Sequence, residues 1–285
     1  MRNLAFGRWM RLIVVAGLCL AQPGAALAEA PSSVNQIRAS YRVGVAAIDL
    51  GTFDLTASVR PDSYSLKARG EFSILAGLVY KGEGNTQSDG KRVNANPRPK
   101  QFNLSYADNR EKRTLEILFA EESAPEVTRI PKKRPDRKAV PLSDDQLRNV
   151  LDPLTAAFLA IHADVPQGDL AVCNQTLPVF DGRQLFELTL SPKRTEELGP
   201  KAAGGLRAAA VCAVRYRPVG GHRPQSSTVA FLQKTNGIEA WLVPVPGTDL
   251  FVPYKVVVPT AWGDGTVMLT KLKTLPGDPR RASAR

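Results

Sequence analysis

The sequence predicts a mainly β protein, an antiparallel curved sheet or barrel-like β fold with one short broken helical insert at about residues 143–163. Apolar residues alternate with small or polar ones in many short segments, and 22 glycines punctuate the chain. Helical spacing is confined to the insert. Many short strands between turns are typical of barrels, sandwiches and curved sheets, so both a closed barrel and an open sheet fit the pattern.

The N-terminus has the three parts of a secretory signal peptide. Three arginines precede an apolar run at residues 12–21, and an Ala-x-Ala site ends at Ala28. The run is too short for the roughly 20 residues that span a bilayer. We therefore predict a signal peptide at 1–28, cleavage after Ala28 and a periplasmic mature protein, with an uncleaved anchor as the alternative.

The mature chain is expected to form a single β-rich domain over residues 29–275, followed by a disordered basic tail at 276–285. Three arginines leave with the signal peptide, so the formal charge falls from +11 to +8. The mature chain has no further apolar stretch of membrane-spanning length, which predicts a protein that does not span the membrane. Export makes nucleic acid a poor candidate partner.

The predicted strands come from apolar residues spaced two apart, the period of a half-buried strand. They lie at 39–49, 52–60, 64–72, 102–106, 115–119, 186–190, 206–216, 228–233, 238–243, 254–258 and 266–273. Residues 262–265 (WGDG) are expected to form a tight turn between the last two. Residues 72–80 are apolar on both faces, which predicts a doubly buried strand or the wall of an apolar pocket.

The helical insert begins with a capping box, in which Ser143 and Gln146 can each satisfy a backbone N–H of the other. Pro153 cannot continue a helix, but it suits the first helical position when Asp152 is the N-cap. We expect two helices, at about 144–150 and 153–163, whose apolar faces plug or cover the sheet.

Two cysteines, Cys173 and Cys212, remain in the mature chain. An even number in an exported protein predicts a disulfide. A metal pair is the rival interpretation, but structural metal sites use three or four ligands and the chain has only two histidines. We predict a disulfide, no metal site and no cofactor.

Asp181, Gly182 and Arg183 can be read as a hairpin turn or as a catalytic loop. Asp-Gly is a strong type I′ hairpin signal because glycine tolerates positive φ, and apolar residues flank the pair. The turn is the favoured interpretation, and Arg183 could still bind an anion. Residues 129–138 (RIPKKRPDRK) carry six basic side chains and one acid, which indicates a solvated loop or contact with an anionic surface.

Residues 152–157 (DPLTAA), 176–183 (TLPVFDGR) and 186–188 (FEL) resemble the DUF3108 family of exported bacterial proteins. The early segment 41–51 and the late segment 253–256 (PYKV) fit the same pattern, so the resemblance covers roughly residues 38–260. It implies a periplasmic β-rich protein without established catalytic residues.

The functional hypothesis is a non-catalytic periplasmic protein of envelope homeostasis that binds a lipid-like or cell-wall ligand, or an envelope protein partner. The expected pocket lining is Phe72, Leu75, Leu78, Tyr80, Phe158 and Trp241. Ordinary core is the alternative for each of them. The rival functions are a hydrolase or transferase that acts on envelope material through Asp152 and Asp181, and a periplasmic protein–protein scaffold. Carboxylates converging in a cleft would favour the enzyme, whereas separate caps and turns would favour the binder.

Overall fold

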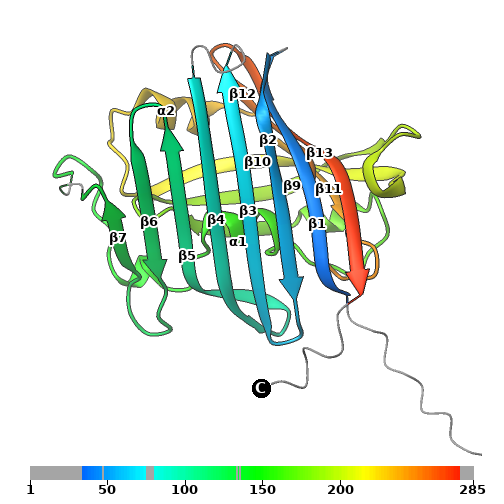
Figure 1. Ribbon diagram of the computed structural model, residues 1–285, viewed down its shortest axis with the longest axis horizontal. Helices are drawn as coiled ribbons and strands as arrows, with labels where there is room; N and C mark the ends of the chain where they lie inside the picture. The colour runs from blue at the N-terminus through cyan, green and yellow to red at the C-terminus, as the bar shows by residue number, and fades with distance from the viewer. Residues whose placement is uncertain (1–33, 47, 75–79, 133, 135, 277–285) are drawn as a thin grey trace, which may run out of the picture. The chain divides into compact units, whose positions relative to one another are not determined.

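One 13-stranded antiparallel sheet forms the framework of the computed structural model (Figure 1). The structure describes residues 34–46, 48–74, 80–132, 134 and 136–276. The predicted signal peptide with its cleavage site, and residues 277–285 of the predicted tail, lie outside the described residues.

The N-terminal half of the sheet is a meander in which each strand pairs with the next. Its strands are β1 (Val34–Val45), β2 (Ile48–Val59), β3 (Ser63–Ile74), β4 (Tyr80–Val93), β5 (Asn96–Asp108), β6 (Lys112–Leu118) and β7 (Glu126–Ile130). The C-terminal half is a second meander. Its strands are β8 (Gln175–Phe180), β9 (Leu185–Glu197), β10 (Ala208–Gly220), β11 (Glu239–Pro244), β12 (Phe251–Thr260) and β13 (Gly263–Pro276).

Pairing of β1 with β13 joins the two meanders, so the first and last strands lie side by side in the middle of the sheet. The strand order runs from β7 through β1 and β13 to β8, and no pairing among the described residues joins β7 to β8. The prediction of a mainly β antiparallel sheet is confirmed, and the sheet is open. Figure 1 shows β9 and β10 crossing behind the N-terminal strands.

The main hydrophobic core lies between the two halves. Its buried side chains include Tyr41 and Leu66 from the N-terminal half and Val243 and Val252 from the C-terminal half. A second core, around Cys173 and Cys212, packs on further side chains of the C-terminal half, including Leu242. Strand β10 contributes side chains to both cores, because Ala209 belongs to the first core and Ala210 to the second.

The helices are short. They comprise η1 (Asp145–Leu147), α1 (Pro153–Phe158), η2 (Leu170–Cys173), η3 (Ala203–Gly205) and α2 (Ser227–Lys234). No helix in the described part of the chain has the length and hydropathy needed to cross a bilayer. Helix α1 contacts β4 in one half of the sheet and β8 and β12 in the other, so it fills space between the two halves.

The predicted helical insert is present but shorter than expected. The capping box forms, with the Ser143 N–H donating to Gln146 Oε1 at 3.0 Å, yet only η1 follows it. Asn149, with φ 58°, turns the chain before Asp152 caps α1. Helix α1 ends at Phe158. The Leu159 and Ala160 N–H groups still donate to Thr155 O, and the chain then bonds to another segment, with Phe251 N–H donating to Ile161 O and Ala163 N–H to Asp249 O.

Two strand predictions and one turn prediction are corrected. Residues 228–233 belong to helix α2, in which the Ser226 hydroxyl accepts from the Val229 N–H as an N-cap. Residues 72–80 are not one strand, because β3 ends at Ile74 and pairs there with Tyr80, the first residue of β4. The last turn consists of residues 261–262, so Gly263 already belongs to β13.

Candidate ligand-binding site

An apolar cleft of about 400 Å³ lies between α1 and the inner face of β2–β6. Its floor follows from the strand register, which pairs Gly70 with Gly84 and Ala68 with Thr86 across β3 and β4. Side chains of paired residues lie on the same face of a sheet, so four small residues adjoin. The Phe72 ring packs over Gly70, and the space above Gly84 stays open. We call this feature the apolar cleft.

Larger side chains form the walls of the apolar cleft. Phe53 flanks the floor on β2, and Phe102, Leu104 and Tyr106 flank it on β5. Leu104 is 36% exposed although it shares a face with the buried Phe102. An inward-facing leucine that remains exposed indicates that the cleft is open to solvent.

Helix α1 forms the roof of the apolar cleft with Pro153, Leu154 and Phe158. The Phe158 ring centroid lies 5.4 Å from that of Tyr41 and 6.0 Å from that of Phe53, in tilted and edge-on arrangements. Aromatic pairs of this geometry add specific attraction to the burial of area. They fix the roof against the first two strands.

Asp152 holds the start of α1 from inside the protein, with no exposed surface. Its Oδ1 accepts hydrogen bonds from the N–H groups of Leu154 and Thr155, both at 3.0 Å. Its Oδ2 accepts from the hydroxyls of Ser88 at 2.7 Å and Thr155 at 2.6 Å. Tyr64 Oη lies 3.0 Å from Thr155 Oγ1 and extends the network.

Burial raises the pKa of Asp152 above its ordinary value, although its hydrogen bonds act in the opposite direction. A carboxylate has about four lone-pair positions, and these four hydrogen bonds occupy them. The geometry therefore makes Asp152 the N-cap that was predicted, with Pro153 at the first helical position. It leaves the carboxylate no acceptor position for a substrate.

Asp181 has a different structural role in the β8–β9 hairpin. Its Oδ1 accepts from the N–H groups of Arg183 at 2.8 Å and Gln184 at 2.7 Å, while Gly182 has φ 82°. The hairpin is present, but Phe180 pairs with Leu185, so the loop has four residues and is not the two-residue type I′ turn expected from Asp-Gly. Asp181 lines the apolar cleft, whereas Asp152 does not.

The structure brings together two of the six residues expected to line a pocket, Phe72 and Phe158. Trp241 lies elsewhere: Arg194 and Lys255 stack on its ring, with the cationic groups 5.3 Å and 4.8 Å from the centroid. Leu75 and Leu78 lie outside the described residues, as does the side chain of Tyr80. Gly70 and Gly84 were not predicted from the sequence, because their contribution depends on the strand register.

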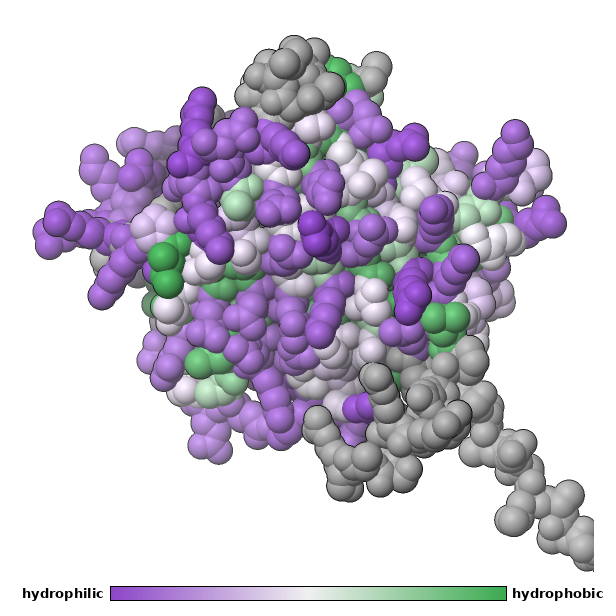
Figure 2. All heavy atoms as spheres, viewed as in Figure 1, coloured by the Kyte–Doolittle hydropathy of each residue, from purple (hydrophilic) through white to green (hydrophobic). Residues whose placement is uncertain are grey.

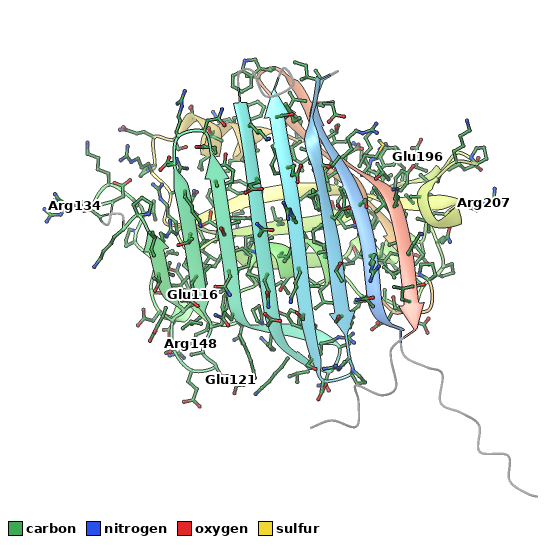
Figure 3. The ribbon with its side chains drawn as sticks, in the orientation of Figure 1. Glu116, Glu121, Arg134, Arg148, Glu196 and Arg207 are labelled. Atoms are coloured by element: carbon green, nitrogen blue, oxygen red, sulfur yellow. A yellow bond between two sulfur atoms is a disulfide. The ribbon has the colours of Figure 1, made fainter. Side chains whose placement is uncertain are left out.

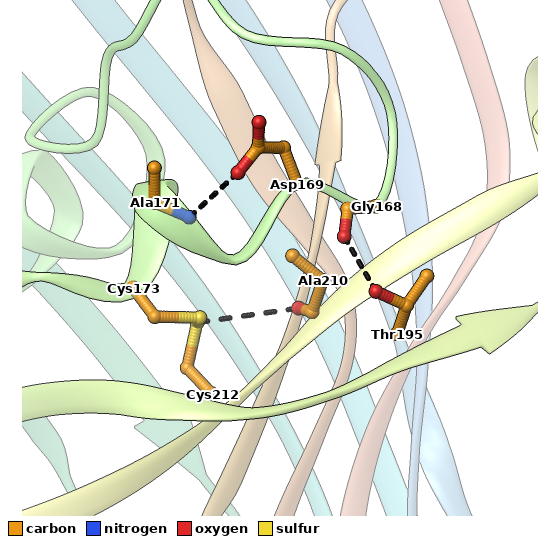
Figure 4. The surroundings of a disulfide bond; sticks show 7 residues. All are labelled: Gly168, Asp169, Ala171, Cys173, Thr195, Ala210 and Cys212. Carbon is orange, nitrogen blue, oxygen red and sulfur yellow. Dashed lines mark hydrogen bonds between the residues drawn. A yellow bond between two sulfur atoms is a disulfide. The ribbon is translucent and has the colours of Figure 1, made fainter.

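Cys173 and Cys212 form the predicted disulfide (Figure 4). Both are fully buried, and the bond ties η2 to β10. Asp169 accepts from the Ala171 N–H at 2.9 Å and so caps η2 beside the disulfide. In the described ranges, no three His, Cys, Asp or Glu side chains are placed to share a metal ion.

A second cleft, of about 1060 Å³, lies between β7, the segment up to Ala139 and the turns at Gly182 and Gly221. Seven of its described lining residues are Lys or Arg, including Arg129, Arg183 and Arg223. Asp136 is the acidic residue among the described lining residues. Asp136 Oδ2 accepts from Arg223 Nε at 2.5 Å and from Arg183 at 3.3 Å. We call this feature the basic cleft.

The outward face of the N-terminal strands is mostly hydrophilic, with scattered hydrophobic residues (Figure 2).

Comparisons with known proteins give a family and a distant structural likeness. The sequence model of the family described as "Protein of unknown function (DUF3108)" matches residues 37–270. A comparison with curated proteins gave no match. A crystal structure described as a beta-barrel-like protein of domain of unknown function DUF1849 from Brucella abortus is 9% identical, with a TM-score of 0.48. That alignment covers 86% of this chain and 99% of the other. The family match confirms the resemblance carried by the sequence motifs: the chain belongs to the DUF3108 family.

Proposed function

We propose that this protein is a non-catalytic periplasmic protein of envelope homeostasis that holds a lipid-like ligand in the apolar cleft. The observation that carries the proposal is the floor of small residues at Gly70 and Gly84, roofed by α1. Ligand sites for small molecules are concave, mostly apolar and roughly 300–1,000 Å³ in volume. At about 400 Å³, the apolar cleft has the size and lining of such a site.

Two further observations support the proposal. The buried disulfide fits an oxidising compartment, as export through a signal peptide would provide. The two carboxylates that a hydrolase or transferase would need are instead engaged separately, Asp152 in capping α1 and Asp181 in holding a turn. Separate caps and turns favour a binding protein over the enzyme.

The apolar cleft can be filled by a single substitution, Gly84→Val. A Cβ added at Gly84 would have its nearest neighbours at 3.7 Å and 3.8 Å, which is ordinary van der Waals contact, so the strand can accept the side chain. The isopropyl group would displace about three carbon groups of the ligand. At about 0.8 kcal/mol each, this costs about 2 kcal/mol, or roughly thirtyfold in affinity.

The test uses delipidated mature protein and the neutral fluorescent probe N-phenylnaphthylamine. The wild type should bind the probe, and Gly84→Val should weaken binding by about thirtyfold. Ser105→Val is the matched control, because it places the same side chain on the opposite face of the neighbouring strand β5. Absence of probe binding by the wild type, or equal affinity in the Gly84→Val variant, would contradict the proposal.

A further inference from the structure

The basic cleft and the apolar cleft meet at the β8–β9 turn. Asp181 lines the apolar cleft, whereas Gly182 and Arg183 line the basic cleft. A Cβ added at Gly182 would lie 3.0 Å from Leu115 Cδ1 and 3.1 Å from Arg129 Nη2. Gly182 therefore lies over the point where an apolar side chain of one cleft adjoins a cationic side chain of the other.

The strand register gives the same continuity from within the sheet. Thr86 pairs with Leu104, Leu104 with Leu115, and Leu115 with Arg129. These four side chains form one row across β4–β7 on the inner face of the sheet. The row starts at the floor of the apolar cleft and ends in the basic cleft. A ligand whose acyl chain lies along this row would place its head group next to Arg129.

Arg129 lacks a counter-ion of its own in the described part of the chain. Its Nη2 atom is buried and has no hydrogen-bond partner among the described residues. Arg183 and Arg223, by contrast, both pair with Asp136. Burial lowers the pKa of Arg129, while the charge of Asp181 raises it. A guanidinium nitrogen that is buried without a partner is costly and would gain from an anionic oxygen.

We propose that the ligand is a single-chain anionic amphiphile, with its acyl chain in the apolar cleft and its anionic head at Arg129 and Arg183. This inference rests on the proposed function and adds the chemical class of the ligand. A volume of about 400 Å³ is near the lower end of the usual range for ligand sites, which suits one chain. Arg183 approaches the same head from the turn that separates the two clefts.

The experiment measures displacement of N-phenylnaphthylamine from the delipidated mature protein by palmitate and by palmityl alcohol. The two competitors share a chain length and differ in the charge of the head. The wild type should prefer the acid by about tenfold or more, because a charge-assisted hydrogen bond contributes at least that much. Arg129→Met should lose most of this preference, because only Arg183 remains at the head, whereas Arg129→Lys, which keeps the charge, should retain more of it.

Arg207→Met is the control for net charge. Figure 3 shows Arg207 projecting from the opposite end of the protein to Arg134, which lines the basic cleft. This variant should keep the preference of the wild type. In the wild type, the preference for palmitate should decrease as ionic strength rises, while the affinity for the alcohol should not decrease.

The outcomes separate this inference from the proposed function. Equal competition by acid and alcohol in the wild type, or a full preference for the acid in Arg129→Met, would contradict recognition of an anionic head group. Either result would still be consistent with the proposed binding of a lipid-like ligand. Inorganic phosphate that competes as well as palmitate would identify a free-anion site and overturn the amphiphile. Absence of probe binding by the wild type, or failure of both acid and alcohol to displace a bound probe, would overturn the proposed function itself.

Discussion

Replacing Asp152 by alanine should destabilise the protein by about 3 kcal/mol. Loss of the N-cap costs about 1 kcal/mol. Loss of the charged acceptor for the buried Ser88 and Thr155 hydroxyls costs about 1.5 kcal/mol for each hydrogen bond. Removing a buried charge offsets about 1 kcal/mol of this sum, since burial already disfavours the carboxylate.

The assay is urea unfolding of the mature protein followed by tryptophan fluorescence. Asp152→Asn keeps an oxygen for the N–H groups of Leu154 and Thr155, and its amide can donate to the two hydroxyls, so about 1 kcal/mol should be lost. Asp145→Ala, at an exposed acid in η1, should stay within about 0.5 kcal/mol of the wild type. Equal stability of the Ala and Asn variants of Asp152 would refute the reasoning from its hydrogen bonds.

Three further predictions concern stability. Replacing both Cys173 and Cys212 by alanine should lower the free energy of unfolding by about 4 kcal/mol, from the closure of a loop of 39 positions, and urea unfolding that matches the wild type would contradict this. Glu239 accepts hydrogen bonds from Arg194, Lys193 and Trp241, which lower its pKa to about 2. The wild type should therefore be more stable than Glu239→Gln above the ordinary pKa of a glutamate, and this advantage should disappear as the pH falls towards about 2. Unfolding measured as a function of pH tests this. Gly221→Ala should lower the free energy of unfolding by more than about 3 kcal/mol, because φ is +77° and a Cβ would overlap the Arg183 carbonyl oxygen. Gly205→Ala, where φ is +70° and the surrounding space is open, should lower it by only about 1 kcal/mol. Thermal unfolding of the two variants measures the difference.

The strands were predictable because each buries one face, and a buried face imposes a period of two on the sequence. The failure at residues 228–233 arises because a short segment can carry two periods at once. Val229 and Phe231 are spaced as in a strand, while Val229 and Leu232 are spaced as on a helix face. The Ser226 cap favours the helix, and Phe231 is left 44% exposed.

The joining of β1 to β13 was not predictable from local pattern, since the pairing spans almost the whole described chain. The apolar cleft depends on this kind of long-range register. Phe72 and Phe158 could be chosen because they are large and apolar. Gly70 and Gly84 contribute by lacking a side chain, and they form a floor only because β3 and β4 align them.

The two sequence motifs that carry the family resemblance meet in space. Pro153 from the first and Asp181 from the second both line the apolar cleft, and Asp152 holds the helix that roofs it. Helix α1 has only six residues, far below the length at which an isolated helix is stable in water. Its position must therefore depend on the cap and on packing. Asp152→Ala should accordingly weaken binding of N-phenylnaphthylamine although Asp152 does not line the cleft, while Glu239→Gln should leave it unchanged. If Asp152→Ala folds and binds the probe as the wild type does, the cap is not what positions the roof.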